Sequence, residues 1–100
     1  MNKKSLDSKW SKAVLERDNN TCQKCLAWTY EPVSPHHVFY RRYLSTRWVV
    51  DNGITLCTTH HRWAHDKPKE FKKWWINRVG EEKAEELRLL SLEIKVVSQI

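Results

Sequence analysis

The feature that most constrains the fold of this chain is a set of two short-spaced pairs of soft metal ligands. Cys22 and Cys25 form the first pair, and Cys57 and His60 form the second with the same gap of two residues. Structural zinc sites are commonly built from two such pairs around a tetrahedral ion. A chain of 100 residues buries only a small core, and a metal is then a common additional source of stability. We therefore expect a structural Zn²⁺ bound by three cysteines and one histidine.

Other uses of the cysteines are less compatible with the spacing. A disulfide framework is disfavoured because three cysteines cannot all pair within one chain. A zinc finger that uses Cys22, Cys25, His61 and His65 would leave 35 residues between its two pairs, whereas the usual finger has about 12. The remaining alternative is three buried free cysteines without a metal.

The histidines supply a second candidate metal site. His61 and His65 are four residues apart, so on a helix their imidazoles share one face, whereas His60 is rotated by about 100° and faces elsewhere. A third ligand would come from His36 or His37, and the other of that pair would point to the opposite side of a strand. Three protein ligands with open positions are typical of a catalytic metal site. The alternative is that His36 and His37 are ordinary polar residues before a strand.

Hydrophobic periodicity and breaker residues predict an α+β chain of short elements. A first helix, capped by Asp7 or Ser8, would carry Trp10 on its buried face and end near 18–20. The further expected elements are a cysteine knuckle over 21–26, a strand over 37–40, a strand-like segment 48–50, a hairpin turn at 51–53, a strand over 54–56, and helices over 60–66, 68–78 and 81 to about 97.

The last two helices carry many apolar side chains. Trp74 and Trp75 lie at helical spacing with Phe71 and Val79, and core packing is a more common explanation for such a pattern than a binding surface. The final helix has Ala84, Leu87, Ile94 and Val97 along one side, and more apolar residues than a lone terminal helix needs. We expect it to pack back on the domain or to meet a partner, and one such partner is a second copy of the chain.

The charge distribution favours a polyanionic partner. The formal net charge is +6, and the basic excess lies in residues 1–79, whereas 80–100 carry more acids than bases. Nucleic acid is the default partner for such a chain, with a merely soluble basic protein as the alternative. No signal peptide and no apolar run of membrane-spanning length is visible. We therefore expect an intracellular, reducing environment and no membrane partner.

The ordered motifs together resemble those of the HNH endonucleases, the ββα-metal nuclease superfamily. The resemblance covers Trp10 to about Asp66 and rests on the helix that leads into Cys-x-x-Cys, on the His36-His37 pair, and on the later motifs. Those later motifs are Asp51-Asn52-Gly53-Ile54 and Leu56-Cys57 followed by His61 and His65. The resemblance implies a small ββα-metal core with a zinc knuckle. It also implies a nuclease domain over 1–79, with its motif core at 10–66, and a C-terminal helix over 80–100. The zinc-knuckle subgroup usually has a second Cys-x-x-Cys, and this chain has His60 as the replacement ligand.

The resemblance also assigns roles residue by residue. His36, His61 and His65 match the ligands of one catalytic divalent ion, His37 matches the general base, and Asn52 matches the asparagine that braces the loop and helps orient the base. The implied reaction is phosphodiester hydrolysis in DNA that leaves 5′-phosphate and 3′-hydroxyl ends. Mg²⁺, Mn²⁺, Ni²⁺ and Zn²⁺ all occur in such sites, and all-imidazole ligation suits a transition metal better than Mg²⁺.

Four arginines near these motifs are candidates for phosphate contacts, namely Arg41, Arg42, Arg47 and Arg62. Phosphate contacts position DNA without reading its sequence, so we expect low specificity, with nicking or double-strand cutting as the outcome. The alternative for each arginine is a solvated basic loop. Two other functions remain open: a zinc-stabilised nucleic-acid-binding module without catalysis, and the nuclease subunit of a larger assembly. Small members of this kind often belong to phages, for which the compartment would be the host cytoplasm.

Overall fold

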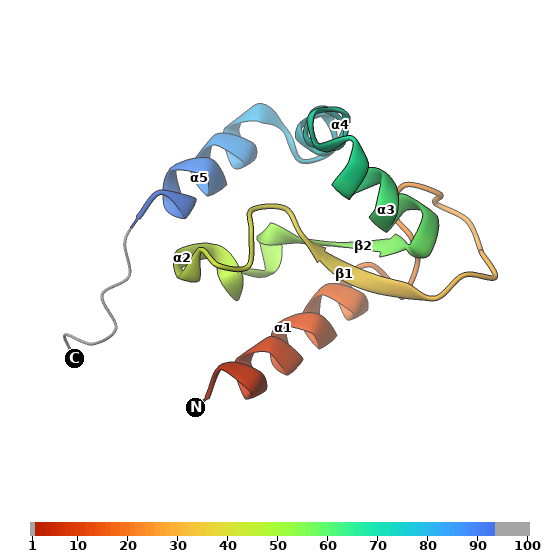
Figure 1. Cartoon of the computed structure of the whole chain (residues 1–100), viewed down its shortest axis with the longest axis horizontal. Coiled ribbons are helices and arrows are strands. Elements are labelled where there is room, and N and C mark those ends of the chain that lie inside the picture. Colours follow the sequence, from red (N-terminus) through yellow and green to blue (C-terminus); the bar gives the residue numbers. More distant parts are fainter. Residues whose placement is uncertain (1, 94–100) are drawn as a thin grey trace.

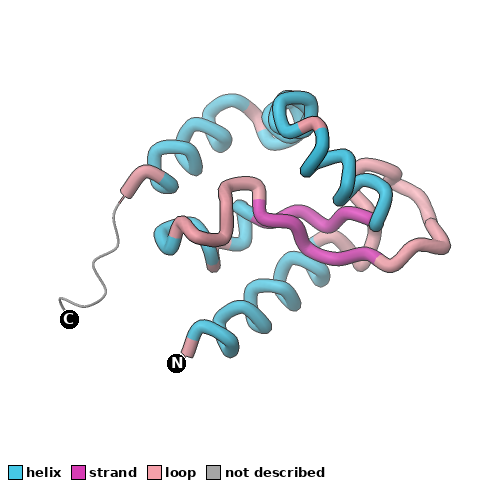
Figure 2. Tube along the Cα trace, in the orientation of Figure 1, coloured by secondary structure: helices cyan, strands magenta, loops and turns pink. Residues whose placement is uncertain are grey.

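The computed structural model describes residues 2–93. Its elements in chain order are α1 (Lys3–Arg17), β1 (Val33–His37), α2 (Leu44–Arg47), the 3₁₀ helix η1 (Val50–Asn52), β2 (Gly53–Cys57), α3 (Thr58–Asp66), α4 (Pro68–Val79) and α5 (Glu81–Ser91). Within this part of the chain, five α-helices surround one two-stranded antiparallel sheet (Figures 1 and 2). The predicted small α+β class is therefore confirmed.

Helix α1 begins earlier than predicted. Asn2 is its N-cap, and the Asn2 Oδ1 accepts a hydrogen bond of 2.8 Å from the backbone N–H of Ser5. Asp7, one of the two caps expected from the sequence, instead lies inside the helix. Its carboxylate accepts hydrogen bonds from Arg47 and Trp48, far along the chain. The helix ends at Arg17 with Asp18 as its C-cap, close to the predicted end.

The sheet places the two adjacent histidines at the end of an edge strand. His36 pairs with Ile54 and His37 pairs with Gly53, so β1 ends at His37 and does not run over 37–40 as predicted. Pro35 lies within β1, opposite Thr55. Proline removes one backbone donor, which an edge strand tolerates because only one of its sides is paired.

Residues 48–53 do not form the predicted hairpin, and that prediction is wrong. Strand β2 pairs with β1, and Val50–Asn52 form η1. The fully buried side chain of Asn52 explains the difference. Its Oδ1 accepts a hydrogen bond of 2.7 Å from the N–H of Phe39, and its Nδ2 donates one of 3.0 Å to the carbonyl of Thr46. The turn is therefore tied to the loop before it and does not connect two paired strands.

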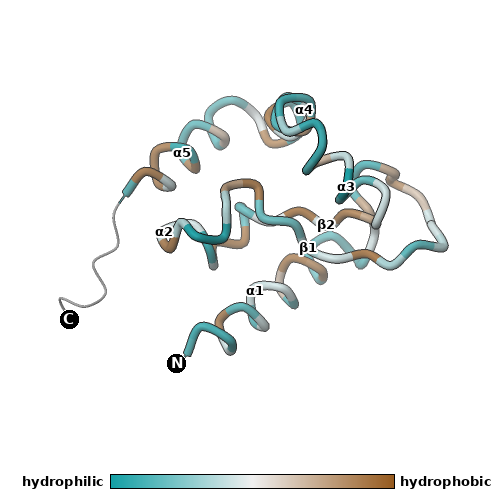
Figure 3. Tube along the Cα trace, in the orientation of Figure 1, coloured by the Kyte–Doolittle hydropathy of each residue, from teal (hydrophilic) through white to brown (hydrophobic). Residues whose placement is uncertain are grey.

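The sheet lies between α1 on one face and α3 with α4 on the other (Figure 1). Strand β2 is buried along its whole length, and Figure 3 shows its hydrophobic residues at the centre of the molecule. A Cβ on Gly53 would lie 2.5 Å from Val14 Cγ2 and 2.6 Å from Trp10 Cζ2, so glycine allows α1 to approach the sheet closely. The buried cluster on the other side of β2 includes Ile54, Leu56, Ala64, Phe71, Trp75, Ala84 and Leu87.

The two helices that follow residue 66 complete this core. Trp75 of α4 is only 1 % exposed, whereas Trp74 is partly buried and packs against the cluster. Ala84 and Leu87 of α5 are buried, so this helix packs back on the domain, which is one of the two arrangements expected.

Ser91 ends α5 among the described residues. The predicted continuation to about 97, with Ile94 and Val97, lies outside them. No helix in the 2–93 segment has both the length and the apolar composition that a membrane span requires.

Candidate functional site

The first candidate metal centre lies where β2 leads into α3. The Sγ atoms of Cys25 and Cys57 are 3.9 Å apart, and the Nδ1 of His60 lies 3.3 Å from each of them and 3.6 Å from the Sγ of Cys22. A tetrahedral zinc ion, with Zn–S near 2.3 Å and Zn–N near 2.0 Å, sets its ligand atoms roughly 3.6–3.8 Å apart. The four side chains therefore fit zinc and could hold one ion, as the spacing predicted.

Backbone hydrogen bonds prepare this cluster for a metal. The N–H of Gln23 donates to the carbonyl of Thr55 at 2.9 Å, which ties the turn after α1 to strand β2. Burial raises the pKa of the Cys22 thiol, but backbone N–H groups, including those of Cys25 and Cys57, outweigh that effect and lower it. Donors directed at the sulfur favour the thiolate, which is the form of cysteine that binds a metal.

A second cluster forms between β1 and α3. His36, His61 and His65 each offer one ring nitrogen, and these atoms lie within 4.8 Å of one another. The rings of His61 and His65 are parallel within 3°, and His36 is nearly perpendicular to both. His60 belongs to the other cluster, as the helical rotation predicted. Three imidazoles from two rigid elements could hold one divalent ion and leave other coordination positions open.

Two observations bear on the state of these imidazoles. The hydroxyl of Ser34 lies 3.1 Å from the Nδ1 of His61, so this partner occupies one ring nitrogen and leaves Nε2 for a metal. Burial, followed by the neighbouring His61 and His65, lowers the pKa of His36 to about 3. A neutral imidazole is the form that ligates metals, so the donor set fits a transition-metal ion.

His37 points to the opposite face of β1, where it meets α1. Its ring stacks on the indole of Trp10, with ring centroids 3.8 Å apart and planes within 9°. Its Nε2 lies 3.0 Å from the backbone carbonyl oxygen of Arg47. A carbonyl only accepts, so Nε2 carries the proton and the Nδ1 of the neutral ring keeps its lone pair. Burial lowers the pKa of His37, against the opposing effect of the Arg47 carbonyl.

Asn52 acts on this arrangement through the backbone. Besides the bonds to Phe39 N–H and Thr46 carbonyl, its Nδ2 donates to the Phe39 carbonyl at 3.2 Å. Residues 39 and 46 flank the loop that follows His37 and precedes the Arg47 carbonyl. Asn52 therefore fixes the loop whose Arg47 carbonyl accepts the His37 proton. None of these Asn52 hydrogen bonds goes to the His37 ring itself.

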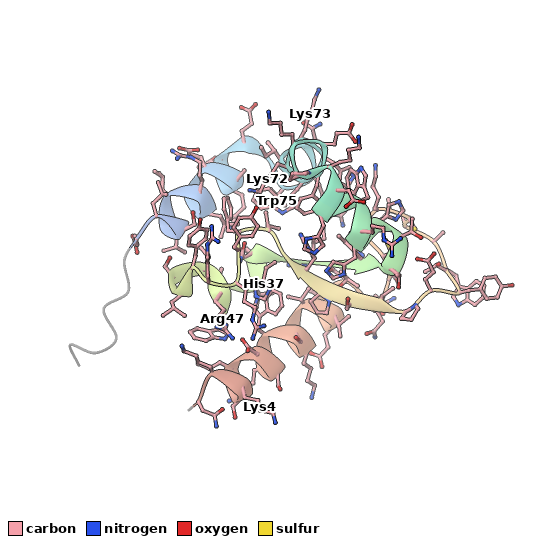
Figure 4. The ribbon with its side chains drawn as sticks, viewed as in Figure 1. Lys4, His37, Arg47, Lys72, Lys73 and Trp75 are labelled. Atoms are coloured by element: carbon pink, nitrogen blue, oxygen red, sulfur yellow. The ribbon has the colours of Figure 1, made fainter. Side chains whose placement is uncertain are left out.

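One pocket of about 470 Å³ collects these groups. Its lining includes both histidines of β1 and two of the three histidines of α3, His61 and His65, together with Arg41, Tyr43 and Lys72 from outside the sheet. His37 also lines this pocket, although its ring stacks on Trp10 on the α1 side of the sheet. Figure 4 shows His37 and Arg47 between the sheet and α1, with Lys72 on the other side.

The four predicted arginines lie in different surroundings. Arg47 is 12 % exposed and pairs with Asp7 through its Nε at 2.9 Å and its Nη2 at 2.7 Å. Arg41 reaches the same carboxylate at 3.1 Å but is largely exposed. Arg42 lies over the rings of Tyr40 and Tyr43, and Arg62 is exposed on α3. Arg41, Arg42 and Arg62 are thus accessible to a large ligand, whereas Arg47 already has an internal partner.

Sequence reasoning missed three contributors to the site. Trp10 was expected to pack in the core, and nothing in the helical pattern of α1 indicates that its ring faces a histidine. Asp7 was expected to be a cap, although it holds Arg47 across 40 residues. Lys72 lies beyond the motif, and its sequence neighbourhood does not indicate that it lines the pocket. In the structure, the ring of its neighbour Phe71 lies 5.0 Å from that of His36.

In comparisons with known proteins, no family model, no curated protein and no solved structure matches this chain.

Proposed function

We propose that this protein is a metal-dependent DNA endonuclease of the HNH type, with a ββα-metal core formed by β1, β2 and α3. The observation that carries the proposal is the shared pocket. It contains a three-histidine cluster that fits a divalent ion and a fourth histidine whose Nδ1 has a free lone pair. A module that only bound nucleic acid would have no use for this fourth group, which is prepared for proton transfer.

The protein groups then divide the work of hydrolysis. His37 Nδ1 accepts a proton from a water molecule as the water oxygen forms a bond to phosphorus and the bond from phosphorus to the 3′ oxygen breaks. The Arg47 carbonyl, which accepts the Nε2–H, stabilises the imidazolium that results, and the Trp10 stack holds the ring plane. The departing oxygen takes a proton from solvent water and becomes a 3′-hydroxyl, and the phosphate remains on the 5′ end.

A divalent ion held by His36, His61 and His65 would polarise a phosphate oxygen and offset the charge that develops on the leaving oxygen. The neutral imidazole ligands leave the positive charge of such an ion available for the phosphate. Ni²⁺, Zn²⁺ or Mn²⁺ suits these nitrogen donors better than Mg²⁺. The separate zinc at Cys22, Cys25, Cys57 and His60 has a structural role.

DNA contacts would come from exposed cations around the pocket. Arg41, Arg42 and Arg62 are accessible and are proposed to contact phosphates, which gives affinity with little sequence specificity. The partly buried pairing of Arg47 with Asp7 gives Arg47 a different role, since its backbone carbonyl holds His37. Leu89 of α5 and the C-cap residue Leu92 are 53 % and 66 % exposed, and we propose this helix as the surface for a second copy or a larger assembly.

Cleavage of supercoiled plasmid tests the proposal. The protein is dialysed against a weak chelator until one zinc per chain remains, and then receives Mg²⁺, Mn²⁺, Ni²⁺ or Zn²⁺. We expect metal-dependent nicking or linearisation by the wild type and its loss in His37→Ala, with DNA binding retained. Light scattering on the same sample distinguishes a monomer of 12.0 kDa from a dimer. Retained, salt-sensitive binding without cutting under any ion would instead identify a nucleic-acid-binding module.

A further inference from the structure

Lys72 of α4 lines the pocket that holds the three-histidine cluster. It lines this pocket together with His36, His61 and His65, although it lies outside the part of the chain that resembles the nuclease family. Its side chain is half-buried, whereas the next residue, Lys73, is exposed. Figure 4 shows Lys72 on the side of α4 that faces the sheet and Lys73 on the outer side.

The Lys72 ammonium has no carboxylate partner in the described part of the chain. The ion pairs found over 2–93 do not include it, and no Asp or Glu lines the pocket. Its Nζ lies instead 4.2 Å from the centroid of the Phe39 ring, a cation–π contact that directs the side chain. Other cations of this protein, such as Arg47 and Lys83, pair with aspartates.

An unpaired cation in a half-buried position is costly unless a ligand supplies the opposite charge. Burial lowers the pKa of Lys72, in keeping with this lack of a counter-ion. Lysine is a common phosphate ligand because a phosphate oxygen can approach its compact ammonium group from many directions. Among the pocket-lining residues of the described segment, Arg41 is the one other basic side chain besides Lys72 and the histidines. The pocket therefore has the charge and the donors to receive an anion beside the three-histidine cluster.

We propose that Lys72 binds a non-bridging oxygen of the scissile phosphate and stabilises the charge that develops there during hydrolysis. This assignment rests on the nuclease function proposed above. It adds to that function a catalytic residue from α4. Phe71 of the same helix, with its ring 5.0 Å from that of His36, brings α4 against the cluster.

The test uses a small substrate that has only one phosphate. Lys72→Met keeps the apolar stem over Phe39 and removes the charge, Lys72→Arg restores a charge, and Lys73→Met is the matched control on the outer side of α4. Hydrolysis of bis(p-nitrophenyl) phosphate and of plasmid is measured with each variant, together with thermal unfolding. We expect Lys72→Met to lower kcat for both substrates by about tenfold or more, with partial recovery in Lys72→Arg and no change in Lys73→Met.

Two outcomes overturn the assignment. One is equal kcat for Lys72→Met and Lys73→Met on both substrates. The other is a loss restricted to plasmid, because Lys72 would then contact a neighbouring phosphate and not the scissile one.

A binding measurement separates this inference from the nuclease proposal. Binding of a DNA duplex is followed at several salt concentrations in the His37→Ala background. We expect Lys72→Met to reduce the slope of log affinity against log salt by about one. If the wild type cleaves neither substrate, the nuclease proposal fails, and this slope still decides whether Lys72 contacts a phosphate. An unchanged slope overturns the contact.

Discussion

The indole of Trp10 lies flat against the imidazole of His37, with their ring centroids 3.8 Å apart. The same indole donates its Nε1–H to the carbonyl of Val49 at 2.8 Å, so α1 holds both the ring of the proposed base and the segment before η1. Helix α1 is therefore part of the site, although it contributes no metal ligand.

Replacing Trp10 separates the stack from the hydrogen bond. Trp10→Leu removes both, and we expect kcat for DNA cleavage to fall by about tenfold or more because the base loses its orientation. Trp10→Phe keeps an aromatic face and should retain most of kcat. Steady-state kinetics with KM measured separately checks this. Equal kcat in the two variants would mean that the stack does not orient His37.

Gly53 sets the distance between α1 and the sheet. In Gly53→Ala the added methyl would meet Trp10 and Val14, so we expect a loss of about 1–3 kcal/mol in the free energy of unfolding. The φ of Gly53 is −117°, which alanine adopts without strain, so the cause is crowding alone. Urea unfolding measures the loss. The double variant with Val14→Ala should recover part of it relative to the sum of the single changes. Strict additivity would contradict the crowding.

Asn52 is expected to be a structural brace with a functional effect. Asn52→Ala leaves the Phe39 N–H without its partner and removes one of the hydrogen bonds that the Thr46 carbonyl accepts, which should cost about 1–3 kcal/mol. Asn77→Ala on the exposed side of α4 is the control, and should change stability little. Urea unfolding of the two variants provides the comparison. Similar losses would show that the Asn52 network is not stabilising.

Zinc content should depend on the first cluster and not on the second. After dialysis, we expect one zinc per chain in the wild type and in His36→Ala, and none in Cys57→Ser. His60→Cys should retain the ion, since a fourth thiolate is an accepted ligand. Metal analysis with circular dichroism measures both content and folding. Retention should weaken in acid because protons compete for the thiolates. Full zinc in Cys57→Ser would reject the Cys22, Cys25, Cys57 and His60 centre.

Asp7 should stabilise the fold in a pH-dependent manner. Hydrogen bonds from Arg47 hold its pKa below the usual value, so the unfolded chain binds the proton more readily than the folded one. The stabilisation is complete above the unfolded pKa of about 3.9 and declines as the pH falls below it. Asp7→Asn should cost about 1 kcal/mol at pH 7, because Asp7 is partly exposed.

The difference in unfolding free energy between wild type and Asp7→Asn isolates this effect from acid release of zinc. It should shrink in urea titrations as the pH is lowered from 7 toward 3. Glu85→Gln, which removes an exposed carboxylate paired with Arg88, is the control. A wild-type advantage that stays constant with pH would exclude the carboxylate as its source.

The sequence predicted what depends on local spacing. Two local patterns were enough to assign the ligands to two clusters, and the structure contains both clusters. These patterns are the gaps within 22–25 and 57–60 and the helical phase of His60, His61 and His65. Helix α4 was likewise close to its predicted bounds. Each of these features depends on residues a few positions apart, for which backbone geometry alone fixes the direction of the side chains.

Features that depend on distant contacts were not predictable in the same way. The turn at Asn52 has the composition of a hairpin, yet its side chain bonds to Phe39 and Thr46, and β2 pairs with a strand 20 residues earlier. The start of α1 and the roles of Asp7 and Lys72 also follow from partners elsewhere in the chain. Local patterns do not record such partners.

His60 and His61 are neighbours in α3, yet they face two different clusters. The number of residues from Cys57 to His65 must therefore satisfy the ligand geometry of both clusters. Adding or deleting a residue between Cys57 and His60 would turn the following side chains by about 100°, and both centres would lose donors. A change between His61 and His65 would take a donor from the second centre alone, so no part of this short stretch tolerates an insertion or a deletion without loss of a ligand.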